Sequence, residues 1–72
     1  RVTRYTLSPR PPYTFDPASA QLVIEWDSNG HNGGALAFAA DGTLFVTSGD
    51  GTADSDADLM GQRTDHLRAK VL

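Results

Sequence analysis

Hydrophobic and polar positions along this chain alternate over short runs, and none of them repeats with the period of a long helix. Residues 2–7 and 21–26 are rich in β-branched and aromatic side chains, which favours two strands. Residues 31–51 predict a hairpin, and residues 66–72 predict a last strand. The pattern therefore predicts an all-β protein with antiparallel strands.

The turn of the hairpin lies at Asp41-Gly42, and two loop lengths are compatible with these residues. A two-residue loop would place Leu36 opposite Thr47. A three-residue loop over residues 40–42 would place Leu36 opposite Val46, so that large apolar residues face each other. We therefore predict the three-residue loop, with its glycine in the left-handed conformation.

The open end of this hairpin carries a histidine and an aspartate. In the predicted register Asn32 faces Asp50 and His31 faces Gly51. Strict alternation would then direct the side chains of His31 and Asp50 to opposite faces of the ribbon. A contact needs a local bend, which Gly33-Gly34 can provide. Each residue could instead have a purely structural role. His31 could hydrogen-bond to a backbone carbonyl, and Asp50 could hold an Asx turn.

Both faces of the hairpin are apolar, which predicts cover on both sides, as in sheets stacked against one another in a β-propeller. One face carries Leu36, Phe38, Leu44 and Val46, and the other carries Ala35, Ala37, Ala39 and Phe45.

Composition limits what the chain can be. Its 72 residues are 39% hydrophobic and contain no cysteine, which excludes disulfides and thiolate metal sites. The net charge of −3 comes without a basic stripe, so we expect no nucleic-acid partner. No apolar run approaches the ~20 residues of a membrane span, and no signal peptide is visible. Because the sequence starts at Arg1 and stops within a predicted strand, we expect it to be a fragment of a longer protein.

Residues 51–65 are polar and predict a long loop with one helical turn near residues 57–62. Their acids resemble the start of a calcium loop, but the sixth position is Leu59 instead of glycine and the twelfth is Asp65 instead of glutamate. We therefore expect a solvated loop and assign no metal ligand here. We expect surface positions or incidental packing for Asp54, Asp56, Asp58, His66 and Met60.

Several of these motifs together resemble the glucose/sorbosone dehydrogenase family, whose members are six-bladed β-propellers. They are His31-Asn32-Gly33-Gly34, the Asp41-Gly42 turn, residues 44–46, residues 48–51 and Lys70-Val71-Leu72. The resemblance implies about one to one and a half blades within residues 1–72. Residues 1–27 would form outer strands of a preceding blade, and residues 31–72 the inner hairpin, long loop and third strand of the next.

The resemblance also implies a chemistry, that of dehydrogenases that use pyrroloquinoline quinone (PQQ) and calcium to oxidise sugars or polyols. His31 would correspond to the base that takes a proton from a sugar hydroxyl while hydride passes to the quinone, and Asp50 to its partner carboxylate. The residues that hold PQQ and calcium come mostly from other blades, so none is assigned here. The implied location is periplasmic or secreted. Two alternatives stay open: a non-catalytic propeller that binds a protein or glycan, and a calcium-dependent hydrolase of the lactonase type.

Overall fold

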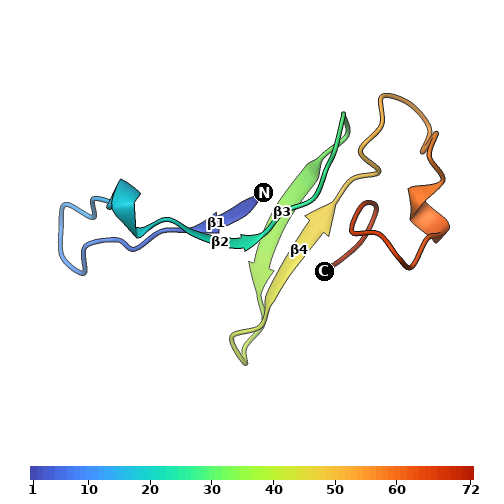
Figure 1. Ribbon diagram of the computed structural model, residues 1–72. Helices are drawn as coiled ribbons and strands as arrows, with labels where there is room; N and C mark the ends of the chain where they lie inside the picture. Colours follow the sequence, from blue (N-terminus) through green and yellow to red (C-terminus); the bar gives the residue numbers. More distant parts are fainter.

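The computed structural model describes all 72 residues as two β-ribbons followed by a long C-terminal loop (Figure 1). The first ribbon pairs β1 (Val2–Arg4) with β2 (Gln21–Ile24), and the second pairs β3 (Gly33–Phe38) with β4 (Leu44–Ser48). Two 3-10 turns complete the elements, η1 (Pro17–Ser19) and η2 (Met60–Gln62). Both ribbons are antiparallel and there is no α-helix, which confirms the all-β class. The structure has no helix with the length and apolarity that crossing a membrane requires.

The first ribbon is shorter than its sequence pattern suggests. The predicted strand over residues 2–7 ends at Arg4, and only an isolated bridge joins Leu7 to Phe15. The backbone N–H of Thr6 donates to the Ser19 hydroxyl at 2.8 Å. A side chain therefore replaces a strand partner at this point and ends the ladder.

The turn end of the second ribbon has the predicted register. Leu36 pairs with Val46, and the Ala39 N–H donates to the Thr43 carbonyl at 2.9 Å, which leaves a three-residue loop. Gly42 has a φ of +87°, in the left-handed region that glycine adopts without a steric penalty. The predicted loop length and the role of its glycine are confirmed.

The open end of this ribbon is shifted by one residue. Continuing from Leu36 and Val46 would pair Gly33 with Gly49, but Gly33 pairs with Ser48. The irregularity falls at Gly33 and Gly34, whose φ values are +68° and +115°. The unshifted register is thus wrong at Gly33, although the Gly51 N–H still donates to the carbonyl of His31 at 3.2 Å, as expected for residues that face each other.

The C-terminal segment follows the other edge of β4 (Figure 1). The N–H groups of Val46 and Ser48 donate to the carbonyls of Leu72 and Lys70, each at 2.9 Å. The predicted strand over residues 66–72 is too long, since only its last three residues lie along β4. The preceding residues turn, with Ala69 at a φ of +55°.

The molecule is elongated, 46 × 27 × 17 Å, and its core is small. Buried residues lie where β4 meets the loop that follows it: Val46, Ser48, Gly51, Thr52 and Met60. In contrast, β3 is exposed along its whole length, and Phe38 is 75% exposed. Among the apolar side chains of the hairpin Val46 is buried, whereas Leu36, Phe38 and Phe45 stay exposed.

Candidate functional site

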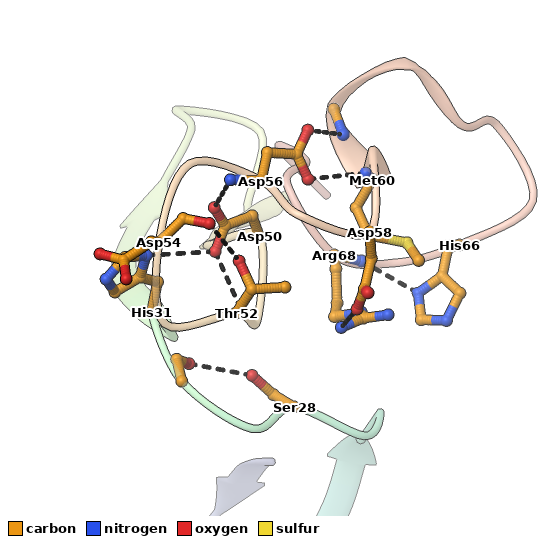
Figure 2. A network of polar contacts seen from close by, with 12 residues as sticks. Ser28, His31, Asp50, Thr52, Asp54, Asp56, Asp58, Met60, His66 and Arg68 are labelled. Atoms are coloured by element: carbon orange, nitrogen blue, oxygen red, sulfur yellow. Dashed lines mark hydrogen bonds and ion pairs between the residues drawn. The ribbon is translucent and has the colours of Figure 1, made fainter.

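The open end of the β3–β4 ribbon brings a histidine against an aspartate (Figure 2). His31 lies just before β3 and Asp50 just after β4. The Nδ1 atom of His31 lies 3.3 Å from Oδ1 of Asp50. The register shift at Gly33 and Gly34 is the bend that this contact requires, because an unshifted ribbon would direct the two side chains to opposite faces.

Gly49 allows the two chains to approach closely beside this pair. A Cβ atom at Gly49 would lie 1.8 Å from the carbonyl oxygen of His31, which no side chain can tolerate. Without a side chain at Gly49, the two backbones can form two hydrogen bonds. The Gly49 N–H donates to the backbone carbonyl of Asn32 at 2.9 Å, and the Gly51 N–H donates to that of His31 at 3.2 Å. These two backbone bonds close the open end of the ribbon and fix the backbone of His31.

Two backbone groups hold the carboxylate of Asp50. Its Oδ1 accepts from the Thr52 N–H and its Oδ2 accepts from the Asp56 N–H, both at 3.0 Å. The hydrogen bond from Thr52 is the largest cause that lowers the pKa of Asp50 below its ordinary value of 3.8. Asp56 and His31 lower this pKa further, and burial opposes them. Asp50 thus forms the Asx turn considered as the alternative role, while its Oδ1 also faces His31.

His31 offers one free ring nitrogen. Its side chain is 56% exposed, whereas that of Asp50 is 17% exposed. Because an ionised carboxylate only accepts hydrogen bonds, we assign the proton of the neutral imidazole to Nδ1, the atom that faces Asp50. Nε2 then carries the lone pair. A neutral imidazole with this arrangement can take a proton from a hydroxyl group.

The loop after Asp50 is more ordered than the sequence predicts. The carboxylate of Asp56 accepts from the N–H groups of Met60 and Gly61, at 2.7 and 2.8 Å. Asp58 forms an ion pair of 3.0 Å with Arg68. The expectation of a solvated acid is therefore wrong for Asp56, which is half-buried, while Asp58 stays exposed as expected. No three side chains of the kinds that ligate metals converge anywhere in the structure.

The base of this loop packs against the C-terminal segment. Met60 is 5% exposed and belongs to the core, so its expected incidental role is wrong. Above it, the ammonium of Lys70 donates to the carbonyls of Met60 and Arg68, at 2.7 and 2.9 Å. His66 is half-buried instead of lying at the surface, and its Nδ1 accepts from the Arg68 N–H at 3.5 Å. The predicted helical turn is present as η2.

A cavity of about 560 Å³ lies between the two ribbons. Its lining includes Asn32, the residue that follows His31 in the sequence. Asn32 and Gly33 line it on one side, and Trp26 and Arg1 line it on the other. Arg1 is already paired with Glu25 at 2.8 Å. The cavity therefore combines an aromatic surface with neutral polar groups, a combination common in small-molecule sites.

Some contributors to the site had a signal in the sequence and others had none. Asp50-Gly51-Thr52 has the spacing of an Asx turn, so the sequence contains a signal for the Thr52 N–H as a donor to Asp50. Gly49 had no such signal, because its role depends on a close approach to His31 on the facing chain, and Asp56 had none, because its role depends on the left-handed backbone of residues 55 and 56. No protein-family model, curated protein or solved structure matches this chain. The geometry of His31 and Asp50 and the motifs around them are therefore the features that bear on function.

Proposed function

We propose that this chain belongs to a six-bladed β-propeller dehydrogenase of sugars or polyols, in which His31 is the general base and Asp50 orients it. The observation that carries the proposal is the 3.3 Å contact between His31 Nδ1 and Asp50 Oδ1, which leaves Nε2 free at an exposed position. We further propose, from the motif resemblance, that the protein works in the periplasm or outside the cell.

The chemistry that these two residues support is proton abstraction. Nε2 of the neutral imidazole accepts the hydroxyl proton, and the resulting imidazolium is stabilised by the carboxylate at Nδ1. The carboxylate is suited to this role because backbone N–H groups hold it in place and lower its pKa, so that it stays ionised. Oxidation of the substrate carbon also needs a two-electron acceptor, which the resemblance implies is PQQ with calcium.

The residues of this chain do not fit those cofactors. Calcium needs several oxygen ligands, and no three ligating side chains converge. PQQ carries carboxylates, for which cationic side chains are the natural partners. Arg68 is paired with Asp58, Lys70 donates to backbone carbonyls, and the group beside His31 is the anionic Asp50. We therefore assign no cofactor contact to these residues.

The exposed hairpin supports the propeller part of the proposal. Leu36 is 59% exposed and Phe38 75% exposed, and Phe45 on the other face is 45% exposed. Apolar side chains on both faces of a ribbon are stable when sheets stack on both sides, as propeller blades do. In this proposal neighbouring blades cover both faces of β3 and β4.

Turnover tests the proposal directly. Full-length protein loaded with PQQ and calcium should reduce an artificial electron acceptor when an aldose is supplied. His31→Ala should lower kcat by about 10²–10⁴ because it removes the base. His66→Ala serves as the matched control and should keep its turnover, since His66 lies outside the site.

Other results would favour the other classes of propeller. Unchanged turnover in His31→Ala would reject the assignment of the base. A full-length protein that binds no quinone would point to a non-catalytic propeller that binds a protein or glycan. Opening of sugar lactones that stops when calcium is chelated would point to a hydrolase of the lactonase type.

A further inference from the structure

The second oxygen of Asp50 is held by a residue that plays no part in the proton transfer. Asp56 donates its backbone N–H to Oδ2 of Asp50 at 3.0 Å. We infer that Asp56 is a positioning residue, which orients the carboxylate of Asp50 toward His31. This inference rests on the proposed role of Asp50 and extends it to the loop that follows.

One hydrogen bond would not orient this carboxylate. The Thr52 N–H and the His31 ring both meet Oδ1. The torsion that turns a carboxylate is broad, so a group held at one oxygen can rotate. The Asp56 N–H at Oδ2 supplies the second point and sets the plane of the carboxylate. Oδ1 is then kept in front of Nδ1 of His31.

The backbone of Asp56 needs support to present this N–H. Ser55 and Asp56 have φ values of +48° and +47°, in the left-handed region that side chains other than Asn and Asp disfavour. The carboxylate of Asp56 accepts from the N–H groups of Met60 and Gly61, which anchors the turn to η2. The side chain of Asp56 therefore holds the backbone that directs its own N–H at Asp50 (Figure 2).

The neighbouring acids separate this role from a general effect of charge. Asp58 is engaged by Arg68 at 3.0 Å. The carboxylate of Asp54 makes no hydrogen bond or ion pair, although it lies in the same loop and carries the same charge. Asp54→Asn thus removes one negative charge from the loop and leaves the support of Asp50 intact.

The tautomer of His31 reports the position of Asp50 without any need for turnover. Nitrogen-15 NMR of the imidazole in full-length protein, at a pH where the ring is neutral, distinguishes a proton on Nδ1 from one on Nε2. We expect mainly the Nδ1–H form in the parent protein and in Asp54→Asn. Asp56→Gly keeps the left-handed backbone accessible but removes the anchor, so the ratio of Nδ1–H to Nε2–H should fall several-fold, toward that of Asp50→Asn.

Asp56→Asn provides a second test, because asparagine tolerates the same backbone and keeps one of the two acceptor oxygens. It should give an intermediate tautomer ratio. A ratio unchanged in both Asp56 variants, together with a loss in Asp50→Asn, would overturn the inference. A fall of the same size in Asp54→Asn would overturn it as well, since charge alone would then be the cause.

The two proposals fail in different ways. A fall in the ratio without any turnover of aldoses would reject the dehydrogenase and keep Asp56 as the residue that positions Asp50. Turnover that depends on His31, with a ratio indifferent to Asp56, would keep the dehydrogenase and reject the role of Asp56.

Discussion

At the scale of single residues, Asp50 determines what the site can do. Its carboxylate meets two backbone N–H groups and one imidazole, and each of the three favours the ionised form. The sequence indicates an Asx turn at Asp50 as one possible role, because the bond from Thr52 depends only on local spacing. It does not predict the bond from Asp56, because two successive left-handed residues make that bond and no composition pattern marks them.

The hydrogen bonds to Asp50 predict a specific response to acid. Its pKa is lowered, chiefly by the Thr52 N–H, so its contribution to stability is complete above the unfolded value of 3.8. The contribution is lost as the pH falls through the lower, native value. In full-length protein the amide shifts of Thr52 and Asp56 should therefore change with a midpoint below pH 3.8. A midpoint at or above 3.8 would show that these bonds do not favour the ionised form.

Asp65 provides a parallel case away from the site. The side-chain hydrogen bond from Arg63 lowers the pKa of Asp65 to about 2. Arg63→Gln should return the pKa of Asp65 toward 3.8 and leave that of Asp50 unchanged, which carboxyl carbon shifts measured across an acid titration would show. A shifted Asp50 midpoint in this variant would mean that the two carboxylates are coupled.

At the scale of elements, the sequence predicts the strand register of the β3–β4 ribbon correctly near the turn and less well at the open end. Large side chains set the register near the turn, because slipping by one residue would exchange the two faces. At the open end Gly33 and Gly34 have no side chains to set the register. The sequence indicates that a bend is possible there, and only the structure shows the shift by one residue. The contact between His31 and Asp50 depends on that shift.

Substituting a glycine at each end tests the importance of the shift. Gly33 has a φ of +68°, and a Cβ there would lie 2.9 Å from the Gly49 nitrogen. Gly33→Ala should therefore lower the fraction of Nδ1–H tautomer at His31 and lower kcat. Gly42 has a φ of +87° with open space around its Cβ position. Gly42→Ala should cost about 1 kcal/mol from backbone strain and leave the tautomer unchanged. Equal effects of both variants on the tautomer would argue against a special role for the shift.

At the scale of the whole molecule, the chain has little interior. Only 5 of its 72 residues are buried, and two-stranded sheets are marginal in isolation. The sequence predicts the all-β class, because short alternating runs exclude long helices. It predicts the last strand poorly, because Ala69 turns the chain and only residues 70–72 reach β4.

This exposure predicts how residues 1–72 behave when they are produced alone. We expect no sharp transition in differential scanning calorimetry. Folding of this chain buries too few apolar side chains to make its unfolding cooperative. The isolated chain should also lack dehydrogenase activity. A sharp, cooperative transition of the monomer would contradict the proposal that neighbouring blades cover the hairpin.

The central claim is that His31 and Asp50 act as one unit, and a double-mutant cycle on kcat in full-length protein tests it most directly. Asp50→Asn alone should lower aldose turnover by about 10²–10⁴, since it removes the charge that stabilises the imidazolium. Adding Asp50→Asn to His31→Ala should lower turnover no further, because an orienting residue has no effect without its base. A double variant whose loss is the product of the two single losses would contradict the account.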